Sequence, residues 1–177
     1  ICTASSLPAH GLGRDKFVTD LAHILTAQEA DRLKERLSAY EKETTAEIVV
    51  VIIPTLADYG YDNISQFTTT LGHEWKIGKK VAHNGIMLAI SIKERKTDIR
   101  TGGGSEDGFG AIKADRALKK MKPFMRSGNY FAAISSVIDD ATAAIANTDA
   151  TNKPVIDAET AKQQKFKQDE ISAAIAD

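Results

Sequence analysis

Apolar side chains recur every three or four residues in four parts of the chain, a spacing that predicts amphipathic helices. The first begins at Thr26, where a hydroxyl followed three residues later by the carboxylate of Glu29 forms a capping box. The second carries its apolar face from Ile64 to Trp75, with Gly78 predicted as its C-cap. The predicted helices are residues 26–43, the segment from Ile64 to Gly78, residues 113–122 (ending before Pro123) and residues 129–146.

Two runs, residues 47–53 and 85–92, are predominantly apolar, and the first is rich in β-branched residues, which is typical of strands covered on both faces. A polar turn at residues 93–96 leads into an alternating strand at 97–101, so we expect an antiparallel hairpin. Residues 17–21 form a short extended lead-in. This order of elements predicts an α/β fold, a helix/sheet/helix sandwich with a mixed, mainly parallel central sheet and an antiparallel hairpin.

The chain has 177 residues, about the length of one domain. We divide it into an irregular N-terminal segment (1–16), a domain (17–146), and a linker followed by a marginal helix or disordered tail (147–177). The sequence opens Ile1-Cys2 without methionine, which favours removal of a leader and a location outside the cytoplasm. Cys2 is then either a lipid-bearing residue or an incidental one.

Lys and Arg number 23 against 24 Asp and Glu, so the net charge of −1 argues against a nucleic-acid-binding protein. No apolar run approaches the length of a membrane span. One segment departs from this balance, with six cations and a single acid, Asp115, between residues 113 and 126. It is either a solvated helix face or a contact surface for a membrane protein complex or an anionic surface. The cations are Lys113, Arg116, Lys119, Lys120, Lys122 and Arg126.

A glycine-rich segment, residues 102–108, is predicted to be a loop. It lacks the Gly-Lys-Ser/Thr of a phosphate-binding P-loop, and Asp107 stands where a dinucleotide-binding motif has its last glycine. Glu106 and Asp107 instead suit calcium or magnesium, which prefer oxygen ligands. The alternative is an ordinary solvent-exposed exit from the hairpin. No spacing typical of a Ser-His-Asp or Cys-His catalytic site is present.

Short stretches along residues 17–146 form an ordered series. They are Val18–Asp20, Ile24–Glu29, Glu43–Val51, Trp75–Lys80, Asn84–Leu88, Arg95–Arg100, the residues Gly102, Gly104 and Glu106, and Ser127–Tyr130. The series resembles the TPM domain, a family named after a thylakoid-lumen protein, a photosystem repair factor and a modulator of acetylcholine receptors. The resemblance implies a sandwich domain outside the cytoplasm, often tethered to a membrane. Some relatives bind divalent cations, some are proposed acid phosphatases, and others are accessory factors of membrane complexes.

Two functions follow as hypotheses. The first is a binding or accessory module outside the cytoplasm, with the basic segment as its contact surface. The second is a metal-assisted acid phosphatase acting on phosphate monoesters, with Arg116 as the nearest cation for phosphate oxygens. In that case the acidic side chains must converge, which depends on the hairpin exit folding back to the carboxyl ends of the parallel strands. The candidate metal ligands are Asp58, Asp62, Asn84, Glu106, Asp107 and Asp115.

Overall fold

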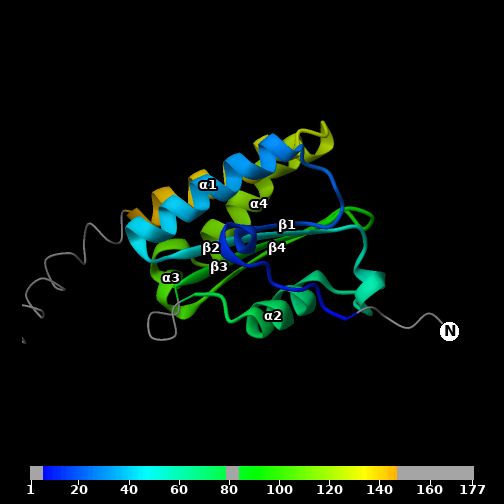
Figure 1. The fold of residues 1–177 in the computed structure, drawn as a ribbon, viewed down its shortest axis with the longest axis horizontal. Coiled ribbons are helices and arrows are strands. Elements are labelled where there is room, and N and C mark those ends of the chain that lie inside the picture. Colours follow the sequence, from blue (N-terminus) through cyan, green and yellow to red (C-terminus); the bar gives the residue numbers. More distant parts are fainter. Residues whose placement is uncertain (1–5, 79–83, 147–177) are drawn as a thin grey trace, which may run out of the picture.

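The computed structural model describes residues 6–78 and 84–146. Its centre is a four-stranded sheet in the order β1-β2-β3-β4 (Figure 1). The first three strands are parallel and β4 runs antiparallel to β3, so the predicted mixed α/β sandwich is confirmed. The strands are β1 (Val18–Asp20), β2 (Glu47–Ile53), β3 (Gly85–Ser91) and β4 (Lys96–Thr101).

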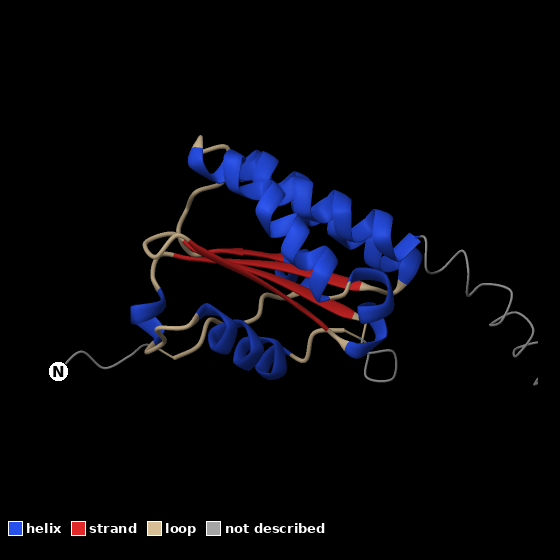
Figure 2. Cartoon of the chain, turned by 180° about the vertical axis from the view of Figure 1, so that it is seen from behind, coloured by secondary structure: helices blue, strands red, loops and turns tan. Residues whose placement is uncertain are grey.

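Helices cover both faces of the sheet (Figures 1 and 2). One layer contains α1 (Ala27–Thr44), α4 (Ala111–Arg126) and a helix formed by residues 130–146, whereas α2 (Ile64–Trp75) lies on the opposite face. Two ion pairs join the three helices of the first layer: Arg36–Asp139 at 2.5 Å and Lys120–Asp140 at 2.9 Å. Within the described residues, no helix is long and apolar enough to cross a membrane.

The core forms around β2 and β3, in which every residue is buried. Val50 of β2 pairs with Val18 of β1 and Leu88 of β3, and it is fully buried because helices cover both faces of the sheet. Burying such predominantly apolar strands removes a large apolar area from water, which is the main stabilising contribution to the fold. The prediction of two strands covered on both faces is confirmed.

Helix α1 begins as its sequence predicts. The Thr26 hydroxyl accepts a hydrogen bond from the Glu29 N–H at 3.2 Å, and the Glu29 carboxylate accepts one from the Thr26 N–H at 2.9 Å. This reciprocal arrangement satisfies two backbone donors that the first turn leaves free. Leu33 and Leu37 turn to the sheet and are fully buried.

Helix α2 packs its predicted apolar face against the sheet, with Phe67 and Leu71 fully buried and Trp75 8% exposed. Its end differs from the prediction, because Lys76 rather than Gly78 takes the left-handed C-cap conformation, at φ 52°. Gly78 has a different role. A Cβ atom on it would lie 2.5 Å from the Gly85 nitrogen, so glycine is needed for the close approach to β3.

The prediction of a loop at residues 102–108 is wrong, because α3 (Gly103–Phe109) is a helix. Glycine disfavours helix by about 1 kcal/mol per residue relative to alanine. Here burial of Phe109, which is 0% exposed, offsets that preference. The predicted end of the next helix at Pro123 is also wrong, since α4 includes Pro123 and continues to Arg126. Pro123 cannot donate a hydrogen bond to the Lys119 carbonyl, but Met121 and Met125 on either side of it pack against the core and keep the helix continuous.

Residues 6–12 are irregular, and the 3-10 helix η1 (Gly13–Phe17) follows them. A second 3-10 helix, η2 (Leu56–Tyr59), follows β2. The linker and tail at residues 147–177 and the proposed lipid site at Cys2 lie outside the described residues.

Candidate functional site

The predicted metal ligands lie at two opposite edges of the sheet. Asp58, in η2, and Asp62 follow β2 and so lie beyond the carboxyl ends of the parallel strands. Asn84 directly precedes β3, and Glu106 belongs to α3, which follows the antiparallel β4. The Gly102 N–H bonds to the Gly85 carbonyl at 2.8 Å, which places the start of α3 beside the amino end of β3. The hairpin exit does not fold back to the other edge.

The remaining two ligands do not restore the expected cluster. Asp107 lies within α3, next to Glu106. Asp115 is an exposed residue of α4 whose carboxylate pairs with Lys119 at 2.8 Å, and this hydrogen bond lowers the pKa of Asp115. Across residues 6–78 and 84–146, no three His, Cys, Asp or Glu side chains gather as a metal site would require. The structure therefore divides the candidates between two edges of the sheet and places Asp115 on the exposed surface of α4.

Three of the six cations of the basic segment are already engaged. Lys113 donates to the Gly108 carbonyl at 2.7 Å, Lys119 pairs with Asp115, and Lys120 pairs with Asp140. In the described part of the chain, Arg116, Lys122 and Arg126 have no carboxylate within ion-pair distance. Two of these three unpaired cations stand at the C-terminal end of α4.

That end of α4 forms one wall of a cleft of about 900 Å³. The other wall is the hairpin turn between β3 and β4, which contributes two further cations, Lys93 and Arg95. We call this cavity the basic cleft. It is lined by Ser91, Ile92, Lys93, Arg95, Thr97, Lys122, Met125, Arg126, Gly128 and Tyr130.

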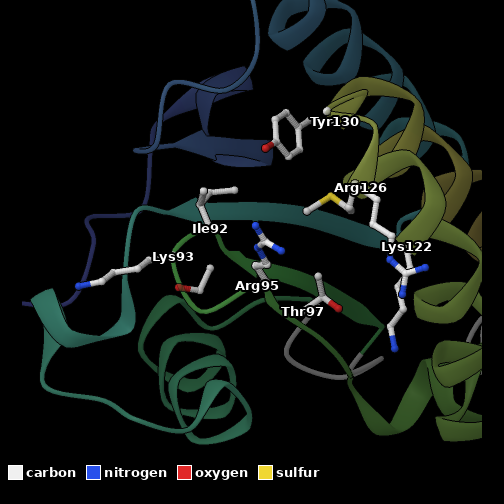
Figure 3. A pocket seen from close by; sticks show the side chains of 10 residues that line it. Ile92, Lys93, Arg95, Thr97, Lys122, Arg126 and Tyr130 are labelled. Carbon is white, nitrogen blue, oxygen red and sulfur yellow. The ribbon is translucent and has the colours of Figure 1, made fainter.

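The cations of the basic cleft are not equivalent (Figure 3). Arg95 lies on one side of Thr97, and Lys122 and Arg126 lie on the other, while Tyr130 stands above them. Lys93 extends away from this group. The cleft thus holds three positive charges from two sides. Thr97 and Tyr130 add hydroxyl groups to its lining, and Ile92 and Met125 add apolar surface.

No lining residue of the basic cleft is acidic. The nearest acid along the chain, Glu94, is held against the segment that follows β2. Its carboxylate accepts hydrogen bonds from the Ser91 hydroxyl, from the Thr55 hydroxyl at 2.5 Å and from the Leu56 N–H at 3.2 Å. Partial burial raises the pKa of Glu94, but these hydrogen bonds outweigh burial and lower the pKa to about 2. The positive charge of the cleft is therefore not neutralised from its own turn.

A helix start adds to the positive potential. Asn129 caps the helix of residues 130–146, because its side-chain oxygen accepts a hydrogen bond from the Ala132 N–H at 3.1 Å. Gly128 and Tyr130, on either side of that cap, line the cleft. The amino end of a helix carries a partial positive charge, so it reinforces the field of the neighbouring cations.

The sequence predicts a functional role for only some of the cations that line the basic cleft. Lys122 and Arg126 belong to the predicted basic segment, whereas Lys93 and Arg95 belong to the predicted polar turn at residues 93–96. Arg95 adopts a left-handed backbone with φ 53°, which is uncommon for a residue other than glycine. Charge in a hairpin turn is common, and nothing in the sequence indicates which helix end the turn will face.

A second cavity, of about 460 Å³, lies between the N-terminal segment and the end of α2. His10 stacks on Trp75 with ring centroids 4.5 Å apart, and the Trp75 indole N–H donates to the Pro8 carbonyl at 2.9 Å. The Nε2 atom of His10 is buried without a hydrogen-bond partner. Burial lowers the pKa of His10, an effect only partly opposed by the negative charge of Glu47. These contacts fasten the N-terminal segment to the domain.

Comparison with known families identifies the domain. The family model described as the TPM domain matches residues 18–144, from β1 to near the end of the last described helix. The chain belongs to the TPM domain family. The resemblance drawn from the ordered stretches is thereby confirmed. Among curated proteins, none matches this chain significantly.

Solved structures resemble this TPM domain over most of its length. The N-terminal domain of a protein from P. gingivalis has 26% identity and a TM-score of 0.66, covering 74% of this chain and 82% of that one. The BA42 protein of the psychrophilic Bizionia argentinensis has 20% identity and a TM-score of 0.60, covering 70% and 82%. The N-terminal domain of the cg2496 protein from Corynebacterium glutamicum has 13% identity and a TM-score of 0.58, covering 78% and 85%. The last two support the fold alone.

Proposed function

We propose that this TPM domain is a binding module outside the cytoplasm that assists a membrane-associated complex by docking on an anionic partner. The observation that carries the proposal is the basic cleft, which is lined by Arg95, Lys122 and Arg126 and in which no carboxylate of the described residues pairs with them. Unpaired cations in a concave surface concentrate positive potential and attract negatively charged partners. The location is proposed from the family resemblance.

Binding rather than catalysis is the function that the described residues support. The candidate oxygen ligands are divided between two sheet edges, and one of them, Asp115, is bound to Lys119. In the described part of the chain the histidines and carboxylates form no group that could hold a metal. We therefore do not extend the proposal to divalent-cation binding or to hydrolysis of phosphate monoesters.

The proposal is tested by reversing charge in the cleft. The double variant Lys122→Glu/Arg126→Glu should lose binding to fluorescently labelled poly-L-glutamate, which presents the carboxylates of an acidic protein surface. The matched control is Arg32→Glu/Lys42→Glu, which changes the net charge equally at exposed positions of α1. We expect at least a tenfold weaker affinity for the cleft variant at low salt, and an unchanged affinity for the control.

The salt dependence of binding and the control variant together show whether the basic cleft is the binding site. Binding by the wild type should weaken steadily as salt is added, because screening reduces attraction between exposed charges. Equal loss in both double variants would show that net charge alone attracts the polymer and would refute a role for the cleft. Absence of any binding to anionic polymers or anionic vesicles by the wild type would also refute the proposal.

A further inference from the structure

The basic cleft is built more specifically than a docking surface for any acid requires. Its cations come from two sides, with Arg95 on the hairpin and Lys122 and Arg126 on α4. A single carboxylate is planar and is satisfied by one guanidinium that donates two parallel hydrogen bonds. Three cations around one space instead match a group with several oxygens and more than one face.

A phosphate group has those properties. It is tetrahedral, it carries a full negative charge or more, and its oxygens accept hydrogen bonds from several directions. Arginine suits such oxygens because its planar fork donates in pairs, and lysine adds a point charge. Thr97 and Tyr130 also line the cleft, and their hydroxyl groups can donate further hydrogen bonds. The donor set therefore fits a phosphate better than an isolated carboxylate.

The size and lining of the cleft say more about the ligand. A volume of about 900 Å³ is within the range of small-molecule sites and far exceeds one phosphate. Ile92 and Met125 are half-buried apolar residues in the same cavity. Apolar surface beside a charged pocket favours a phosphate that is attached to an organic body over inorganic phosphate alone.

We infer that the basic cleft binds the phosphate group of an organic phosphate, held by Arg95, Lys122 and Arg126. This inference rests on the proposed function and names the chemical group that the anionic partner presents. The group is supplied either by the headgroup of an anionic phospholipid in a bilayer or by a soluble phosphate ester. No bond to phosphorus is made or broken in this step, because the site is one of recognition.

The test measures three ligands with the whole chain. They are vesicles of phosphatidylglycerol mixed with phosphatidylcholine, soluble glycerol phosphate, and poly-L-glutamate. Binding to the mixed vesicles but not to vesicles of phosphatidylcholine alone assigns a lipid headgroup, and binding of glycerol phosphate assigns a soluble ester. Either result supports the inference. Binding of poly-L-glutamate alone overturns it while leaving the proposed function standing, and binding of none overturns both.

Two neighbouring substitutions show whether the cleft itself is the site. Arg95→Gln and Lys93→Gln remove the same charge from the same turn, but Lys93 extends away from the group formed by Arg95, Lys122 and Arg126. Arg95→Gln should weaken phosphate binding at least tenfold, and Lys93→Gln by less than threefold. Equal effects would overturn the inference, because attraction by net charge does not depend on where a side chain points.

A conservative exchange gives an independent readout. Arg126→Lys keeps the charge but removes the paired donors, so it should weaken binding of the phosphate ligand more than binding of poly-L-glutamate. Circular dichroism and melting temperatures of all variants establish that each is folded. A folded Arg126→Lys variant that loses both ligands equally would contradict recognition of the phosphate group.

Discussion

The hydrogen bonds of Glu94 determine which charge the turn between β3 and β4 presents to the basic cleft. Its carboxylate lies one residue from Arg95, yet it is taken up by the Thr55 hydroxyl and the Leu56 N–H, which belong to the segment after β2. The Lys93 N–H also bonds to the Pro54 carbonyl at 2.9 Å. These hydrogen bonds hold the turn against the segment that follows β2. That arrangement leaves the guanidinium of Arg95 as the charge presented to the cleft.

Replacement of Glu94 by glutamine should reduce stability in a pH-dependent way. The pKa of Glu94 is lowered to about 2, so its ionised form is favoured by folding. Its stabilising contribution is present above the pKa of the unfolded chain, about 4.5, and is lost as pH falls through the folded value. Near neutral pH we expect Glu94→Gln to cost about 1 kcal/mol after allowance for solvent screening. Urea unfolding of both proteins at several pH values measures this.

The difference between wild type and Glu94→Gln should therefore shrink as the solution becomes acidic. A difference that is constant between about pH 7 and pH 3 would mean that the charge of Glu94 contributes nothing and only its shape matters. Thr55→Val is a useful companion variant, because it removes one donor while the carboxylate remains.

Trp75 stabilises the fold both through its buried ring and through the hydrogen bond of its indole N–H, and two substitutions can separate these contributions. Its ring is 8% exposed and stacks on His10, and its indole N–H bonds to the Pro8 carbonyl. Trp75→Phe keeps an aromatic ring but loses the hydrogen bond, so it should cost about 1 kcal/mol. Trp75→Ala also leaves a cavity and should cost roughly 3–5 kcal/mol. Both values come from the free energy of unfolding in urea, and equal losses would contradict the separation.

At the scale of elements, the junction of α3 and α4 depends on Gly110. A Cβ atom there would lie 2.7 Å from the Glu106 carbonyl oxygen, whereas a Cβ on Gly103 would meet nothing within 4 Å. Gly110→Ala should therefore lower stability by about 1–3 kcal/mol, because backbone must move to relieve the contact. Gly103→Ala should instead raise stability by up to about 1 kcal/mol, since alanine favours helix. Opposite shifts in melting temperature are the expected result.

The N-terminal segment should loosen on acidification through His10. Burial lowers its pKa below the usual 6.5, opposed by Glu47 and by a backbone hydrogen bond at Lys16, while the Lys16 charge lowers it further. The folded state thus binds fewer protons, so stability present above about pH 6.5 falls as pH drops through the folded pKa. His10→Phe keeps the ring but does not titrate, so its stability should fall less between about pH 7.5 and 5.5.

Measuring the difference between the two proteins cancels the contribution of every group that they share. The expected result is that wild type becomes less stable relative to His10→Phe as pH falls. An unchanged difference would show that protonation of His10 does not act on the segment. A difference that grows in favour of wild type would contradict burial as the dominant effect on His10.

The sequence pattern predicts correctly those helices and strands that are determined by residues adjacent in the chain. The capping box at Thr26 and the β-branched run of β2 are read directly from neighbouring residues, and both are confirmed. Helix α3 was missed because its glycines disfavour helix individually, while the compensating burial of Phe109 is a tertiary effect. The predicted end of α4 at Pro123 is wrong because the sequence shows the hydrogen bond that proline removes, whereas the packing of Met121 and Met125 on the core is a tertiary effect.

At the scale of the whole molecule, the basic cleft shows why function was harder to predict than fold. The family could be recognised because its motifs follow one another along the chain. The cleft instead joins Arg95 to Lys122 and Arg126 through the register of the hairpin and the angle at which α4 crosses the sheet. The acidic candidates failed to converge for the same reason, because reversal of β4 sends α3 to the opposite edge.

The arrangement of the layers also predicts how much of the chain the fold needs. All four strands and the helices packed on both of their faces are built from residues before 147 (Figures 1 and 2). The apolar residues of the last described helix, including Ile134 and Ile138, are already buried within this sandwich. A chain ending at Asn147 should therefore unfold cooperatively, with a melting temperature within a few degrees of the full chain. Calorimetry of both chains measures this, and a broad or strongly lowered transition would mean that residues after 147 contribute to the packing of the domain.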